Sequence, residues 1–160
     1  MGITAKLFWI LVIFFVEQLP GVSSVGVDLP LIFVVLTGLR SDAAGAAGWG
    51  FLMGVLQDML SANWTGPNTI TKTLIGLFSC FAKKHIYRER VGTQTFLIFC
   101  ATLLHQLFLW LLMKWDGPAP PAGDAFWIIF ESVVMTSVAG MVVSFVVVKL
   151  RKRRYDPATA

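Results

Sequence analysis

Four ionisable side chains lie inside or beside apolar segments, and their chemistry needs an explanation: Asp58, Lys72, His105 and Glu131. Two carboxylates can share general acid–base work, but nothing in the sequence brings Asp58 and Glu131 together. Asp58 and Lys72 flank the turn 61–67, which predicts an ion pair between adjacent antiparallel helices. In the alternative, Lys72 extends outward and Asp58 contacts headgroup water.

The other two ionisable groups favour structural roles. A lone histidine within a span, such as His105, is more often hydrogen-bonded structure than a ligand or a catalyst. Glu131 lies within two turns of the outer end of its segment and could reach the interface. The chain contains no H-E-x-x-H, C-x-x-C, G-x-S-x-G or P-loop sequence. The sequence therefore predicts no enzyme activity, no metal and no cofactor.

Small residues recur at a helical spacing in the third apolar segment. Ala46, Gly50, Gly54 and Asp58 follow one another every four residues, so they share one face of a helix. Small residues at this spacing allow a second helix to approach closely within a membrane. The stripe therefore predicts a contact face, either for packing inside a helix bundle or for a partner helix.

Composition and charge define the class of protein that must position these residues. The chain has 160 residues, of which 56% are hydrophobic and 14% charged, and its mean hydropathy is +0.74. A soluble domain would carry about 25% charged residues. The net charge of +4 comes largely from basic clusters at 83–90 and 149–154, each directly after an apolar segment. This placement is typical of cytoplasmic membrane anchors, and it argues against nucleic-acid binding.

Six apolar segments predict an all-α polytopic membrane protein, a compact bundle of about six short transmembrane helices. The segments are 7–19, 29–39, 43–60, 68–82, 94–113 and 125–148. We expect a single transmembrane domain, 1–148, and a basic cytoplasmic tail, 149–160. Nearly all basic residues fall on one side when both termini are cytoplasmic, which favours that topology. Five spans remain possible if the second segment is re-entrant.

A family resemblance rests on the third and fourth segments. The run 49–58, with its glycines and terminal aspartate, resembles the core signature of the bacterial rod shape-determining MreD family. The resemblance continues through a turn and a later glycine: Gly66, Pro67, Asn68 and Gly76. Asp28 and Leu29, before a short apolar run, also resemble the family's second helix. Lys72 departs from the small or polar residue expected there, so an Asp58–Lys72 pair does not carry over to the family.

The resemblance implies a non-enzymatic component of the bacterial inner membrane, with an MreC-like single-span protein as its partner. The wider complex would include the MreB filament, a RodA-type glycan polymerase and a class B penicillin-binding transpeptidase. The family is similar in fold to the substrate-binding subunits of energy-coupling-factor vitamin transporters. The alternative function is therefore a transporter subunit that holds a small molecule in an outer cavity. Its lining would be Asp58, Trp64, Asn68 and Lys72.

Overall fold

The computed structural model describes residue 12 and residues 26–60, 66–83, 91–116 and 121–155. The first predicted segment, apart from Val12, and the turn 61–65 lie outside these residues. The described chain forms helices and no strands. The helices are α3 (Leu29–Gly38), α4 (Ala43–Leu60), α5 (Pro67–Ala82), α6 (Val91–Asp116) and α7 (Ala122–Tyr155). Each of the five later apolar segments therefore lies on a helix, and α6 and α7 extend beyond the predicted limits.

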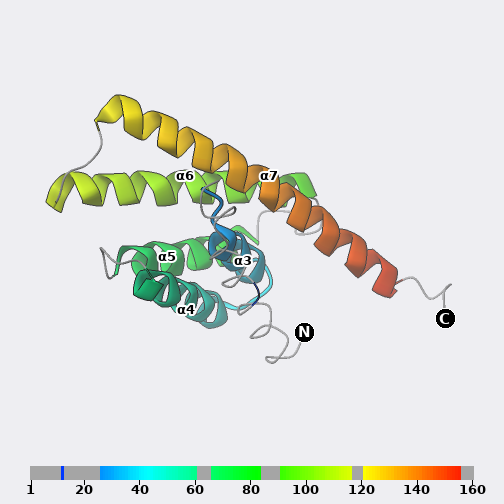
Figure 1. The fold of residues 1–160 in the computed structure, drawn as a ribbon. Helices are drawn as coiled ribbons and strands as arrows, with labels where there is room; N and C mark the ends of the chain where they lie inside the picture. The colour runs from blue at the N-terminus through cyan, green and yellow to red at the C-terminus, as the bar shows by residue number, and fades with distance from the viewer. Residues whose placement is uncertain (1–11, 13–25, 61–65, 84–90, 117–120, 156–160) are drawn as a thin grey trace.

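The helices form two layers with α3 between them (Figure 1). α4 packs most extensively against α5, and α6 packs against α7. α3 contacts all four of these helices. The two layers also contact each other directly between α5 and α6, but this contact is less extensive than the contacts within each layer. The position of α3 therefore decides how the two helix pairs are joined.

α3 contributes more residues to the buried apolar core than any other described helix. Its fully buried side chains include Leu31, Val34 and Val35, which pack with Met53 of α4 and Ile98 of α6. An isolated α3 has only 10 residues and rises roughly 15 Å, about half of a bilayer's hydrocarbon thickness. A helix that is apolar on all sides and surrounded by other helices is a core element.

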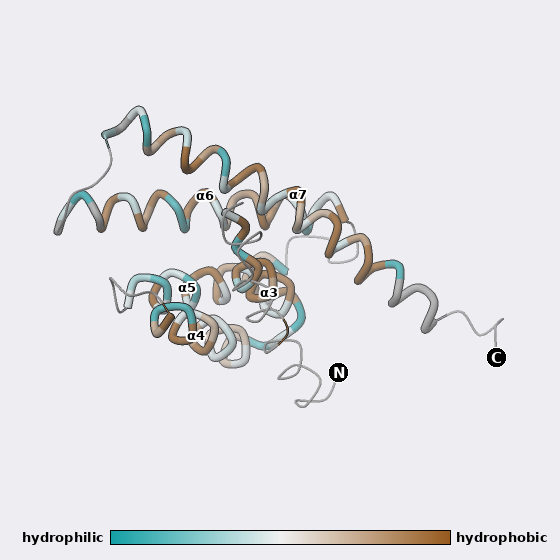
Figure 2. Tube along the Cα trace, in the orientation of Figure 1, coloured by the Kyte–Doolittle hydropathy of each residue, from teal (hydrophilic) through white to brown (hydrophobic). Residues whose placement is uncertain are grey.

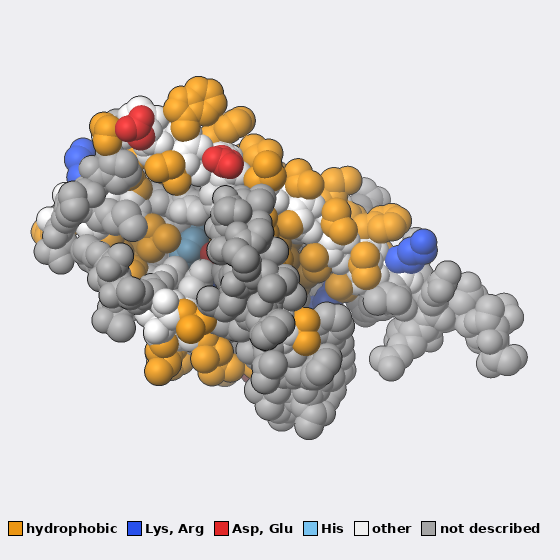
Figure 3. Space-filling view, in the orientation of Figure 1, with side chains coloured by type: hydrophobic (Ala, Val, Ile, Leu, Met, Phe, Trp, Pro, Cys, Tyr) orange, Lys and Arg blue, Asp and Glu red, His pale blue; other side chains and the backbone are white. Residues whose placement is uncertain are grey.

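α6 and α7 are the described helices that are long and apolar enough to cross a membrane. The candidate spans are Val91–Leu112, with 22 residues, and Gly123–Lys149, with 27 residues. Less than a third of each span is buried inside the protein, so large apolar side chains face outward. Figure 2 shows hydrophobic residues recurring along both helices, and Figure 3 shows hydrophobic side chains along the visible surface of α7.

Candidate functional site

A buried carboxylate at the start of α3 joins the two helix layers. Asp28 is the N-cap of α3, and its Oδ1 accepts a hydrogen bond of 2.9 Å from the backbone N–H of Leu31. This bond satisfies one of the donors that the first turn of a helix leaves free. Pro30 fits the same turn because its fixed φ suits a helix start and it has no N–H to satisfy. The local sequence therefore fixes the position of the Asp28 side chain at the start of α3.

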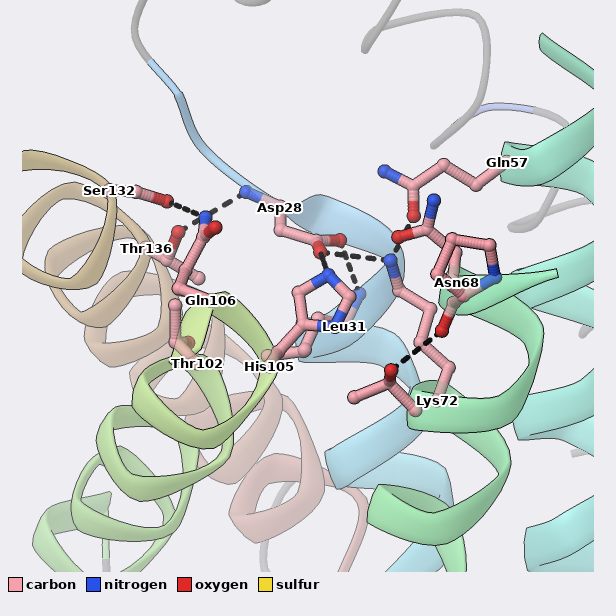
Figure 4. Close-up of polar contacts among 12 residues, drawn as sticks. Asp28, Leu31, Gln57, Asn68, Lys72, Thr102, His105, Gln106, Ser132 and Thr136 are labelled. Carbon is pink, nitrogen blue, oxygen red and sulfur yellow. Dashed lines mark hydrogen bonds and ion pairs between the residues drawn. The ribbon is translucent and has the colours of Figure 1, made fainter. Parts of the chain in front are cut away.

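The second carboxylate oxygen of Asp28 binds two cationic or protonatable groups from different helices. Lys72 Nζ of α5 donates to Asp28 Oδ2 over 2.8 Å, and His105 Nε2 of α6 lies 3.3 Å from the same oxygen. Lys72 is fully buried and also donates to Gln57 Oε1 of α4. Figure 4 shows Asp28 between the His105 and Lys72 side chains. We call Asp28, Gln57, Lys72 and His105 the polar junction.

α7 joins the polar junction through hydroxyl groups. The backbone N–H of Asp28 donates to Thr136 Oγ1 over 3.2 Å. Ser132 Oγ donates to the carbonyl of Gly26 over 2.9 Å and accepts a 2.5 Å hydrogen bond from Gln106 of α6. These bonds connect the segment before α3 to α6 and α7 (Figure 4). Polar contacts therefore connect the start of α3 directly to α5, α6 and α7, and to α4 through Lys72 and Gln57.

The predicted ion pair between Asp58 and Lys72 is wrong. Lys72 pairs with Asp28 instead, and Asp58 caps the N-terminus of α5. The Asp58 carboxylate accepts hydrogen bonds from the backbone N–H groups of Asn68 and Thr69, at 3.2 and 2.9 Å. It also accepts from both of their side chains, at 2.9 and 2.5 Å. A carboxylate suits this position because a helix N-terminus has unpaired donors and a partial positive charge.

The small-residue stripe of α4 lies against α5. Ala46, Gly50, Gly54 and Asp58 are all buried. A methyl group at Gly50 would come within 2.8 Å of the Lys72 carbonyl carbon, and one at Gly54 within 2.7 Å of the Asn68 carbonyl oxygen. A methyl group at Gly76 of α5 would likewise overlap the backbone of Ala46. The close contact predicted for this stripe is therefore made inside the chain.

Backbone geometry also explains the residue types of the motif at 66–68. Gly66 precedes the first turn of α5 with φ +123°, a backbone conformation that other residues rarely adopt. Pro67 fits the first turn, and Asn68 contributes two of the donors to Asp58. The motif residues thus fix the α4–α5 hairpin, and they position Lys72 one turn further along α5.

The polar junction joins helices to one another, and its charged and protonatable side chains are almost completely buried. Asp28, Lys72 and His105 are 7%, 0% and 2% exposed. Within the described ranges, no group of three or more His, Cys, Asp and Glu side chains is placed to hold a metal ion. His105 Nδ1 is buried without a hydrogen-bond partner in the described structure. Glu131, in contrast, is exposed on α7, whereas the buried Asp58 carboxylate is hydrogen-bonded to Asn68 and Thr69 of α5.

Sequence reasoning missed the central role of Asp28. It placed Asp28 at the opening of the second segment, but it did not connect that carboxylate to Lys72, 44 residues away. One signal was available, because a lysine buried in an apolar helix needs a carboxylate and few acidic residues lie at membrane depth. Gln57 and Thr136 carried no comparable signal, since uncharged polar residues occur on many helix faces.

Fold and site together define a helical membrane protein whose buried polar groups hold its own helices in place. A family model for the rod shape-determining protein MreD matches residues 4–118, well over half of the chain. The chain therefore belongs to the MreD family, a family of membrane proteins that act in determining rod cell shape. The match includes the whole polar junction and ends before α7. Neither the curated proteins nor the solved structures contained a match to the chain.

Proposed function

We propose that this protein is a non-enzymatic scaffold in the bacterial inner membrane that binds an MreC-like single-span partner. Through that partner it supports the lateral peptidoglycan synthesis that maintains a rod shape. The wider complex would contain the MreB filament, a RodA-type glycan polymerase and a class B penicillin-binding transpeptidase. Membership of the MreD family supports the link to rod shape, and the resemblance described above suggests these partners.

The observation that most favours a scaffold is the use of the buried polar groups. The Asp28 carboxylate forms an ion pair with the Lys72 ammonium group, and the Asp58 carboxylate accepts hydrogen bonds from the N-terminus of α5. Groups that are already paired and desolvated stabilise one arrangement of helices, and they are poorly placed to turn over a substrate. A rigid arrangement of this kind suits a protein that presents a fixed surface to other membrane helices.

The arrangement in the membrane follows from the charge distribution. We propose a single transmembrane domain, 1–148, with about six membrane-inserted segments and both termini in the cytoplasm. The tail 149–160 and the segment 83–90 would then place their basic residues next to anionic lipid headgroups or cytoplasmic partners. α6 and α7 have the length and apolar composition that two of these spans require.

The transporter-subunit alternative receives no support from the family match. It needs Asp58, Asn68 and Lys72 to line a cavity for a small molecule. Instead, Asp58 and Asn68 are hydrogen-bonded to each other, and Lys72 is paired with Asp28. A ligand that used these groups would first have to break contacts that hold α3, α4 and α5 together.

Purification with and without the partner tests the proposal. The full chain is extracted in mild detergent from cells that also contain the MreC-like protein, and capture of that protein is measured against an unrelated single-span protein. We expect selective capture, and depletion of the chain in a rod-shaped host should produce round cells. If the chain purifies with a stoichiometric small molecule and ignores the MreC-like protein, it is not this scaffold.

A further inference from the structure

One exposed carboxylate interrupts the apolar outer face of α7. Glu131 is exposed, and its neighbours at helical spacing on the same face are large, apolar and exposed as well. This outer face consists of Trp127, Val134, Met135, Val138, Val142 and Phe145. Figure 3 shows red acidic atoms among the hydrophobic side chains along α7.

The opposite face of α7 is already occupied. Most of its buried residues are small or polar, and they spread over an arc roughly 100–220° around the helix from Glu131. Gly140 on this inner face lies so close to Ile98 of α6 that a methyl group would come within 2.8 Å of it. Thr136 on the same face bonds to Asp28. Because these contacts set the rotation of α7, Glu131 cannot turn inward to reach the polar junction.

The position of Glu131 along α7 places it below the membrane surface. The candidate span Gly123–Lys149 has 27 residues and a length of roughly 40 Å, against a hydrocarbon core of about 30 Å. With the span centred, the outer boundary falls near Trp127, an aromatic residue suited to the interface. Glu131 then lies roughly 6 Å inside the hydrocarbon region. A hydrogen-bonding or cationic partner would stabilise a carboxylate at this depth.

We infer that the outer face of α7 binds the transmembrane helix of the single-span partner, with Glu131 as its polar anchor. The occupant is a mostly apolar helix that carries one basic or amide side chain at the depth of Glu131. Charge and hydrogen-bond complementarity select this chemistry, because a basic or amide side chain donates to the carboxylate and the apolar residues on either side of it pack against α7. The inference rests on the proposed scaffold function and adds the face and the residue through which the partner is recognised.

Photo-crosslinking from single positions locates the docked helix. The photoreactive residue benzoylphenylalanine replaces Met135 or Val138 on the outer face of α7, and Leu104 or Leu111 at exposed sites of α6, in the full chain expressed with its partner. We expect crosslinks to the single-span protein from the two α7 positions and none from the α6 positions. Crosslinks from α6 alone, or none from α7 to any protein, overturn the inference.

Substitution of Glu131 tests the anchor with a matched carboxylate as control. Glu131→Leu should reduce partner capture about three- to tenfold, the range expected for one polar contact between helices in a membrane. The melting temperature of this variant without partner should not fall, because the Glu131 side chain is exposed and points away from the described core of the protein. Asp124→Leu alters an exposed carboxylate in the first turn of α7 and should leave capture unchanged. If Glu131→Leu captures as much partner as the unmodified chain, Glu131 is not the polar anchor. If the unmodified chain captures no partner, the scaffold function itself is refuted.

Discussion

The buried pair of Asp28 and Lys72 gives the sharpest test of the architecture. Lys72→Met removes the ammonium group while keeping an unbranched side chain of similar length. Removing one partner of a buried ion pair costs about 3–5 kcal/mol, because the remaining charge stays buried without compensation. Asp28 keeps its hydrogen bond from Leu31 and its contact with His105, so we expect the lower end, about 3 kcal/mol.

Two substitutions of Asp28 separate its charge from its capping role. Asp28→Asn removes the charge but retains a side-chain oxygen for the Leu31 N–H, since asparagine is also a good N-cap. Asp28→Ala should lower the free energy of unfolding by about 1 kcal/mol more than Asp28→Asn does, because it also removes the N-cap hydrogen bond. The double variant Asp28→Asn with Lys72→Met removes both charges. Its loss should be smaller than the sum of the single losses by about 2 kcal/mol, within the range for directly coupled residues.

Thermal unfolding in one detergent, followed by the loss of the monodisperse species, measures these differences. A loss of about 3 kcal/mol corresponds to a fall in melting temperature of about 6–12 °C for a domain of this size. Lys114→Met is the control, because Lys114 is exposed near the end of α6 and its ammonium lies over the Trp110 ring. Additive losses in the double variant, or equal effects of Lys72→Met and Lys114→Met, would refute the buried pair.

Three further predictions concern the helix hairpin and the topology. Gly54→Ala should destabilise by about 1–3 kcal/mol, because its methyl group meets the α5 backbone. Gly48→Ala, in open space on the same helix, should be neutral or stabilise by up to about 1 kcal/mol in the same melting assay, and equal effects would contradict the packing. Asp58→Ala should lower the free energy of unfolding by about 1–2 kcal/mol. Its effect should add to that of Lys72→Met, because Asp58 and Lys72 have different partners. A strongly non-additive effect in the double variant would instead support an Asp58–Lys72 pair. Cysteine labelling from outside intact cells should modify 116–124 and spare 83–90, and the reverse pattern would invert the proposed topology.

The sequence predicted the helices well because helix formation in a membrane depends on local composition. Apolar runs bounded by Pro, Gly and charged residues placed all five described helices to within a few residues, apart from the longer C-terminus of α7. The spacing of Gly50, Gly54 and Asp58 likewise identified a face for close helix contact. Both are properties of a single segment, readable without knowledge of its neighbours.

The pairing of the charged groups was not predictable in the same way. Asp58 and Lys72 are near in sequence and lie on neighbouring helices, yet rotation of α5 directs the Lys72 side chain toward α3 and Asp28. Asp58 meanwhile reaches backbone donors that only exist once α5 has formed. A sequence shows which groups need partners in a membrane, but the choice among possible partners depends on helix rotation and depth.

The sequence alone was enough to predict a helical membrane protein and the positions of α3 to α7. It also carried the resemblance to the MreD family, and the family match confirms that resemblance. Tertiary structure decided that α3 lies at the centre, that Asp28 joins four helices, and that Glu131 faces outward from α7. The physical reason is the range of the interactions involved. Hydropathy and a local N-cap such as Asp28 act over a few residues, whereas a buried charge can be paired by any residue that the packing of the whole chain brings within hydrogen-bond distance.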